Sequence, residues 1–423
     1  MPRTYNGACA GTALVLAITA PLFSSQVYRD NLPADHPSIQ YLQRAVDDPV
    51  HRLAASINRG EIRLRPQQDA EAYVPELLQR LEINTNSQML VFSKTSLQAA
   101  HISPDRPRAL YFNDTAVVAY VPGATAVELV ATDPRQGPIF YAVTVDAGGT
   151  PSFARSGTCL HCHQGPNTEG VPGIYVGSVV PGPTGAPRRG DSAIITDHRT
   201  PFADRWGGWY VTSRRGEQPD RANAVASNPA DPDTLIRESQ QNLVSLAGRV
   251  RTADYLAPTS DIVALMVFEH QTQMTNLLTR VGWEWRIRGQ ASAVDDVVKY
   301  MLFKDEASLK EPIEGVSTFT QTFPLRGPRD RRGRSLRDFD LRTRIFRYPL
   351  TYMVYSEAFD ALPGPLRAEI YQRLHDVLAA DRPTAGYDHL TAADRKAILE
   401  IIRETKPNLP RYWRAPAKRT GRR

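Results

Sequence analysis

Apolar and polar positions follow two different periods along the first third of the chain. From residue 36 to about residue 82, apolar residues recur at helical spacing, which predicts helices. Between residues 109 and 145 the segments become short, β-branched or aromatic, and turn residues separate them. These segments are 109–112, 116–121, 126–131 and 139–145. The second pattern predicts an antiparallel meander.

The pattern changes again after residue 150. A cysteine-containing segment is followed by glycine- and proline-dense sequence from 165 to 190, and beyond residue 233 apolar residues return to helical spacing. The helices expected there span about 234–249, 259–281, 291–303, 364–380 and 391–404. We therefore predict an α+β fold, with a β-rich N-terminal half and a mainly helical C-terminal half.

The N-terminus has the composition of an export signal. Arg3 precedes an apolar, uncharged run over residues 8–23, and polar residues follow it. No clean cleavage site follows the run, so an uncleaved anchor is the alternative, although the run is shorter than the ~20 residues that span a bilayer. We expect an exported protein, periplasmic or beyond, that meets a membrane only if this segment (1–25) stays attached.

Positive charge is concentrated at the other end of the chain. The tail 406–423 has no acidic residue and contains seven cationic ones: Lys406, Arg411, Arg414, Lys418, Arg419, Arg422 and Arg423. This exceeds the net charge of +6 of the whole chain, so the rest is near neutral. We expect a disordered tail and no nucleic-acid partner. Between the ends we distinguish 26–150 (helices and meander), 151–215 (cysteine region) and 216–405 (helical region).

Two cysteines remain if the signal, with Cys9, is removed. Cys159 and Cys162 are separated by two residues, and His163 follows at once. This spacing lets both thiols add to the vinyl groups of one haem while the adjacent imidazole binds the iron, with His161 as an outward spacer. A zinc site would need a second ligand pair, a thioredoxin-like pair would need a βαβ unit, and a local disulfide leaves His163 unexplained. We predict one covalent haem c.

The motif is that of the c-type cytochromes, which this chain resembles in the segment 159–163. Three further strings are similar to those of uncharacterised secreted monohaem proteins: LYFNDTAVVAYVPG (110–123), RWGGWYVT (205–212) and DIVALMVFEHQ (261–271). The resemblance implies a shared fold and carries no activity.

Other residues have the chemistry to serve a haem. Arg155 and Arg205 offer guanidinium groups for the propionates, with an ordinary surface ion pair as the alternative for each. Trp206 stands beside two glycines that allow close approach to a flat porphyrin, or it belongs to an aromatic core cluster. His198 follows a carboxylate, as an oriented histidine or as an exposed loop residue.

The helix expected over 259–281 offers a sixth iron ligand. Its apolar stripe is interrupted by Glu269, His270 and Gln273, and burying such groups without partners would cost about 1–3 kcal/mol each. Met266, His270 and Met274 project from one side. We favour His270 as a metal ligand, ahead of Met274, His198 and His101. The alternative is that these side chains simply fill the core.

The leading functional hypothesis is an electron carrier with a periplasmic redox partner protein. The chain is several times longer than a simple carrier needs, which leaves two alternatives open. It could be a haem enzyme or ligand sensor with an open sixth position for peroxide or a small nitrogen oxide, or a haem-bearing subunit of a larger oxidoreductase.

Overall fold

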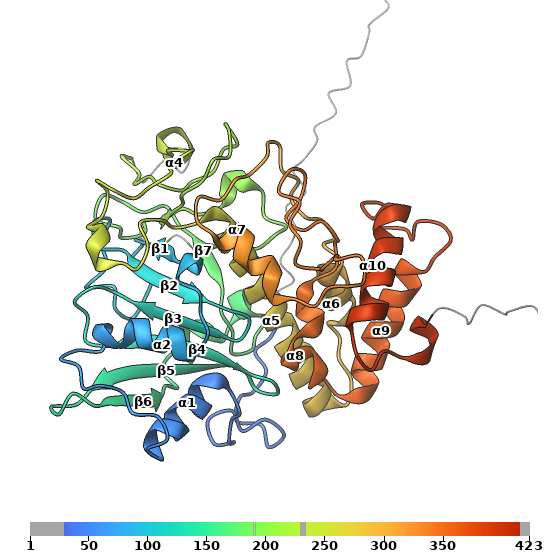
Figure 1. Cartoon of the computed structure of the whole chain (residues 1–423), viewed down its shortest axis with the longest axis horizontal. Helices are drawn as coiled ribbons and strands as arrows, with labels where there is room; N and C mark the ends of the chain where they lie inside the picture. Colours follow the sequence, from blue (N-terminus) through green and yellow to red (C-terminus); the bar gives the residue numbers. More distant parts are fainter. Residues whose placement is uncertain (1–28, 189, 191, 229–233, 415–423) are drawn as a thin grey trace, which may run out of the picture.

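A computed structural model describes residues 29–188, 190, 192–228 and 234–414 (Figure 1). The expected export segment and residues 415–423 of the basic tail lie outside the described residues. The chain has the α+β architecture that the sequence predicts, with the antiparallel sheet in the N-terminal half and most of the helices in the C-terminal half.

A seven-stranded antiparallel sheet forms the first layer, in the order β6-β5-β4-β3-β2-β1-β9. Its strands are β1 (Met89–Val91), β2 (Arg108–Phe112), β3 (Ala116–Tyr120), β4 (Val127–Asp133), β5 (Gly137–Val145), β6 (Pro151–Arg155) and β9 (Trp209–Tyr210). Strands β2 to β5 are the predicted meander. A separate pair consists of β7 (Val176–Ser178) and β8 (Ile194–Thr196). Since β6 and β9 join the main sheet, the region 151–215 is not a separate structural unit.

The helices are α1 (Pro49–Asn58), α2 (Val74–Arg80), α3 (Leu160–His163), α4 (Thr234–Glu238), α5 (Ile262–Arg288), α6 (Val294–Met301), α7 (Phe319–Thr322), α8 (Glu357–Asp360), α9 (Gly364–Leu378) and α10 (Ala392–Thr405). Figure 1 shows α5 between the sheet and the C-terminal helices α6, α9 and α10. Within the described residues, no helix is long and apolar enough to cross a membrane.

The two faces of the sheet bury different sets of side chains. One face, with Leu110 and Phe112, belongs to the large core around α5. The opposite face, with Tyr111 and Val118, packs in a second core with residues of α1 and α2. The alternation along the strands therefore separates two cores, and each strand from β2 to β4 contributes to both.

Helix α5 is the central element of the fold. Asp261 caps its N-terminus by accepting hydrogen bonds from the amides of Val263 and Ala264, and Gly289 ends it in the left-handed conformation. Every residue from Ile262 to Glu284 is buried, including the polar ones. A helix that is buried all round must find a partner inside the protein for each polar side chain.

Three segments differ from the sequence expectation. Residues 36–48 form turns rather than a helix, and α1 begins only at Pro49, after the capping residue Asp48. The helix expected over 234–249 is confined to α4. The described part of the tail, residues 406–414, packs on the fold, because Lys406 pairs with Asp360 and Trp413 is buried in the large core.

Candidate functional site

The cysteine segment forms a short helix directly after the edge strand β6. Helix α3 contains Cys162 and His163, and Cys159 is its N-cap, so the amide of His163 donates to the carbonyl of Cys159 over 2.9 Å. Both cysteines are free thiols. Cys159 is half-buried and Cys162 is exposed. The helix therefore presents two accessible thiols one turn apart, next to an imidazole.

The ring of His163 is oriented by a backbone carbonyl. Its Nδ1 lies 2.9 Å from the carbonyl oxygen of Gly173, and a carbonyl can only accept, so Nδ1 carries the proton. Nε2 then holds an unprotonated lone pair, and within the described residues it has no hydrogen-bond partner. A histidine that donates Nδ1–H to a carbonyl and keeps Nε2 free has the arrangement of a metal ligand.

Aromatic side chains hold the His163 ring from two sides. The ring centroid lies 5.0 Å from that of Phe140 on β5 and 5.4 Å from that of Tyr175. Burial lowers the pKa of His163, and the charge of Arg108 acts in the same direction. The ring is therefore held neutral, which is the protonation state that can bind a metal.

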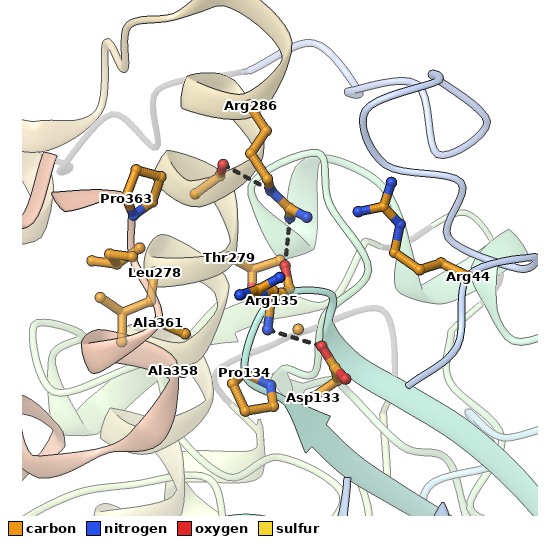
Figure 2. A pocket seen from close by; sticks show the side chains of 13 residues that line it. Arg44, Asp133, Pro134, Arg135, Leu278, Thr279, Arg286, Ala358, Ala361 and Pro363 are labelled. Carbon is orange, nitrogen blue, oxygen red and sulfur yellow. Dashed lines mark hydrogen bonds between the residues drawn. The ribbon is translucent and has the colours of Figure 1, made fainter. Parts of the chain in front are cut away.

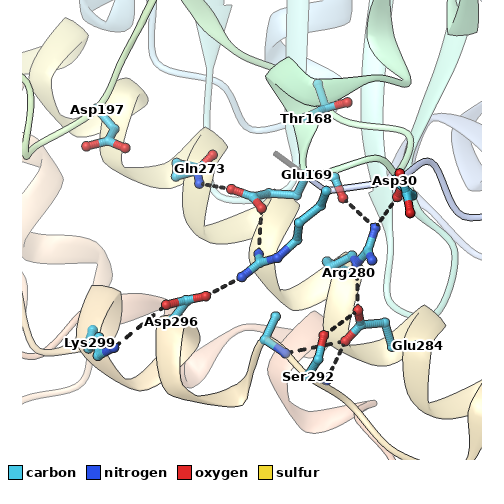
Figure 3. Close-up of polar contacts among 12 residues, drawn as sticks. Asp30, Thr168, Glu169, Asp197, Gln273, Arg280, Glu284, Ser292, Asp296 and Lys299 are labelled. Atoms are coloured by element: carbon cyan, nitrogen blue, oxygen red, sulfur yellow. Dashed lines mark hydrogen bonds and ion pairs between the residues drawn. The ribbon is translucent and has the colours of Figure 1, made fainter. Parts of the chain in front are cut away.

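Three polar residues of α5 fix the loop that carries Gly173. Asn276 makes two hydrogen bonds to the backbone of Ile174, accepting from its amide over 3.1 Å and donating to its carbonyl over 2.8 Å. Gln273 donates to the carboxylate of Glu169 over 2.7 Å, and Arg280 donates to the carbonyl of the same residue over 3.0 Å (Figure 3). The loop is thereby tied to the most buried helix of the fold.

Gly173 has no room for a side chain. A Cβ at this position would fall on Oδ1 of Asn276 and lie 2.8 Å from Cβ of Thr168. The carbonyl that orients His163 is therefore held against α5 by close backbone packing. Neither Gly173 nor Asn276 carries a sequence signal of this role, because each is more than nine residues from the motif.

The loop 41–44 covers the other side of the attachment segment. Leu42, expected on a helical stripe, is 49% exposed, and its methyl carbons lie 3.3 Å from where a Cβ of Gly157 would stand. Arg155 on β6 donates to the carbonyls of Tyr41 and Arg44. Leu42 is thus an exposed leucine against Gly157, two residues before Cys159, and it offers an apolar contact for a flat hydrophobic group.

The surroundings of α3 fit a covalently held haem. Two accessible thiols, a neutral imidazole with a free Nε2, and apolar side chains from Phe140 and Leu42 are the features that such a group requires. Arg155 is the one predicted propionate partner that lies next to the segment. Within the described residues, no group of three or more His, Cys, Asp or Glu side chains is arranged to hold a metal ion.

Arg205 and Trp206 lie elsewhere, in a buried cluster around Glu269 of α5. The carboxylate of Glu269 accepts from Nη1 of Arg205 over 3.1 Å, from Nε1 of Trp206 over 3.0 Å and from the hydroxyl of Thr196 over 2.6 Å. Arg205 also donates to the carbonyls of Thr200 and His198. These partners serve the protein interior, so Trp206 fits the aromatic-core alternative.

His270, the expected sixth ligand, lies in the same buried region. Its Nδ1 is 2.8 Å from Nδ1 of His198, and its Nε2 is 2.7 Å from the hydroxyl of Thr351. The ring stacks on Tyr300 and Phe303 at 5.2 and 4.5 Å between centroids. Both ring nitrogens are thus engaged within the protein, which argues against His270 as an iron ligand.

The structure does not bring the other candidate ligands to His163 either. Met266 and Met274 are fully buried in the large core, His198 is buried rather than in an exposed loop, and His101 is exposed on the β1–β2 connection. Among the described residues, the ring neighbours of His163 are Phe140 and Tyr175.

Comparison with known proteins gives no family for the chain. The chain matches no protein-family model, no curated protein and no solved structure.

Proposed function

We propose that this protein is an exported monohaem c-type cytochrome, with one haem attached through thioether bonds to Cys159 and Cys162 and ligated by His163. The observation that carries the proposal is the hydrogen bond from Nδ1 of His163 to the carbonyl of Gly173, which leaves Nε2 free beside two accessible thiols. A haem bound there supplies a one-electron couple at iron. Periplasmic location and a redox partner protein belong to the same proposal.

The protein's own contribution is to hold the proximal histidine in one orientation. The carbonyl of Gly173 fixes the ring tautomer, Phe140 and Tyr175 limit its rotation, and α5 immobilises the loop behind it. A rigid, oriented ligand keeps the reorganisation between two oxidation states small. This supports electron transfer as the first function.

A second candidate is a haem that binds a small exogenous ligand in its sixth position. The specific observation in its favour is that both ring nitrogens of His270 are engaged by His198 and Thr351. The methionines expected as substitutes, Met266 and Met274, are core residues. Peroxide or a small nitrogen oxide would be ligands of the right size.

Optical spectra of the purified ferric protein, with and without cyanide or carbon monoxide, separate the two candidates. A low-spin spectrum that does not change on ligand addition supports the electron carrier. A high-spin spectrum that shifts supports ligand binding and contradicts the carrier.

Paired histidine variants test the ligand assignment itself. His163→Ala should remove or alter the spectrum in either case, because it removes the proximal nitrogen. His161→Ala is the matched control: this residue is exposed, and its Nδ1 bonds the carbonyl of Thr158. Equal losses in the two variants would contradict the assignment of His163.

A further inference from the structure

A cavity of about 250 Å³ lies where the β4–β5 turn, the C-terminal half of α5 and the segment from α8 to α9 meet (Figure 2). One wall is apolar and is formed by Leu278, Ala358, Ala361, Leu362 and Pro363. The volume is somewhat below the range typical of drug-sized ligand pockets, so the cavity suits a smaller molecule.

Three arginines from three separate segments line the opposite wall. Arg44 comes from the loop before α1, Arg135 from the β4–β5 turn and Arg286 from α5. Figure 2 shows Arg44 and Arg286 reaching toward one another across the cavity, with Arg135 between the turn and the helix. The guanidinium groups thus meet although their residues are far apart in sequence.

No acidic side chain of the described chain pairs with any of the three. Neither Arg44 nor Arg135 has a side-chain hydrogen bond or ion pair among the described residues. Arg286 donates only to the carbonyls of Gly282 and Arg135, and its Nη1 is buried without a partner. Arg135 is exposed and the other two arginines are half-buried, so the buried Nη1 of Arg286 is the donor that lacks the acceptor normally found away from water.

Asp133 also lines the cavity, and its carboxylate accepts hydrogen bonds from the backbone. It accepts from the amides of Arg135, Gln136 and Asp47 over 2.8, 2.7 and 2.7 Å. Its charge offsets only part of the repulsion: burial lowers the pKa of Arg286 to about 10, and Arg44 and Arg135 act in the same direction against Asp133. Like charges that one carboxylate offsets only in part destabilise the empty cavity and favour a bound anion.

We propose that this cavity binds a small organic anion, with its carboxylate between Arg44, Arg135 and Arg286 and a short apolar chain against Leu278 and Leu362. Guanidinium groups match the planar, two-oxygen geometry of a carboxylate. The apolar wall favours a ligand with a hydrocarbon portion over inorganic phosphate. The site does not depend on the haem proposed at Cys159 and Cys162.

Titration of the purified full-length protein with butanoate, at low ionic strength and followed by ligand NMR, tests the proposal. We expect saturable binding with a dissociation constant of about 1 mM or tighter, weaker binding of acetate and of inorganic phosphate, and none of butylamine. Added salt should weaken the binding because the recognition is electrostatic. Phosphate or acetate binding as tightly as butanoate would overturn the assignment to an organic anion.

Arginine variants locate the site. Arg286→Leu and Arg44→Leu should each weaken butanoate binding about tenfold or more, since each removes a charged hydrogen-bond donor. The matched control is Arg288→Leu, on the exposed end of the same helix and outside the cavity, which should bind as the wild type does. Because the Arg44 side chain has no hydrogen-bond or ion-pair partner among the residues that the structure describes, Arg44→Leu should keep the thermal stability of the wild type. Undiminished binding in Arg44→Leu, or no binding by the wild type, would overturn the proposal.

Discussion

His163 and His270 are each oriented by a hydrogen bond at Nδ1, but their second ring nitrogens face different surroundings. Nε2 of His163 has no partner among the described residues, and His163 directly follows the exposed thiol of Cys162. Nε2 of His270 meets the hydroxyl of Thr351 in a fully buried aromatic cage. A free nitrogen is available for chemistry, whereas a satisfied one stabilises the fold. We therefore expect changes at the two sites to separate into effects on haem and effects on stability.

The largest expected effect is a loss of stability in the buried cluster around Glu269, next to His270. Glu269→Ala leaves Arg205, which is 1% exposed, as an unpaired buried charge. Removing one partner of a buried ion pair costs about 3–5 kcal/mol. Denaturant unfolding should therefore show a large loss of stability, while the folded fraction keeps its haem.

Glu314→Ala is the control for that prediction. Its pair with Arg214 is mostly exposed, so its removal should cost less than about 1 kcal/mol. Similar losses in Glu269→Ala and Glu314→Ala would show that the buried cluster contributes no more than a surface pair.

The second largest expected effect is a loss of stability at low pH, caused by the buried pair His198 and His270. Burial lowers the pKa of His270 to about 3 and the pKa of His198 well below its ordinary value. An unfolded histidine takes up its proton near pH 6.5, so between about pH 6.5 and 3 the unfolded state binds more protons and stability falls as pH falls. Each histidine contributes a slope of about 1.4 kcal/mol per pH unit.

Glu269 acts in the opposite direction over part of this range. Burial raises its pKa to about 7, so between about pH 7 and 4.5 the folded state takes up its proton first and offsets one histidine. Burial also raises the pKa of Glu306 to about 7, which offsets the second histidine over the same range. From these four groups, the free energy of unfolding should therefore fall mainly below about pH 4.5, with a slope of about two protons. His270→Phe should flatten this slope, and His51→Phe, on the exposed side of α1, should leave it unchanged. A profile that is flat in the wild type would contradict the neutral buried pair.

Gly173→Ala should affect both stability and the haem, by a smaller amount. The added methyl group collides with Asn276 and Thr168, so the loop must move and the carbonyl that orients His163 moves with it. We expect a stability loss of about 1–3 kcal/mol together with a shifted haem spectrum. Gly165→Ala, where a Cβ meets nothing within 4 Å, is the control. Stability loss without a spectral change would separate the loop from the haem ligand.

The smallest expected effect is spectral and concerns His270. Because both of its ring nitrogens are engaged by His198 and Thr351, His270→Phe should leave the ferric haem spectrum unchanged. Conversion to a high-spin spectrum in this variant would restore His270 as the sixth ligand and remove the distinction between the two histidines.

The regular part of the fold could be predicted because its patterns are long. Alternation over β2 to β5 and the helical periods of α5, α9 and α10 extend over enough residues to be recognised. The strands β1 and β9 have three and two residues, too few for a pattern. Residues 36–48 show helical spacing but contain Pro37 and a left-handed Gln40, and their apolar side chains are buried from turns instead.

The candidate site could be predicted only where its chemistry is local. The spacing of Cys159, Cys162 and His163 is legible in five residues, but Gly173, Asn276 and Phe140 reach His163 through the tertiary fold. For the same reason the sequence could not show that Arg205, Trp206 and His270, which it offered as haem partners, lie away from His163. The polar residues on α5 do have hydrogen-bond partners, as their burial requires. The sequence does not show whether such a partner is haem or, as for Glu269, another side chain of the protein.

The covalent attachment of haem is the most direct test of the account. The full chain should be expressed with a working cytochrome c assembly system, extracted with acid acetone, and assayed as the pyridine haemochrome, with mass mapping of the peptide that contains Cys159 and Cys162. We predict one haem per chain that resists extraction and stays on that peptide. Haem that extracts into acid acetone, or a chain that carries none, would contradict the account.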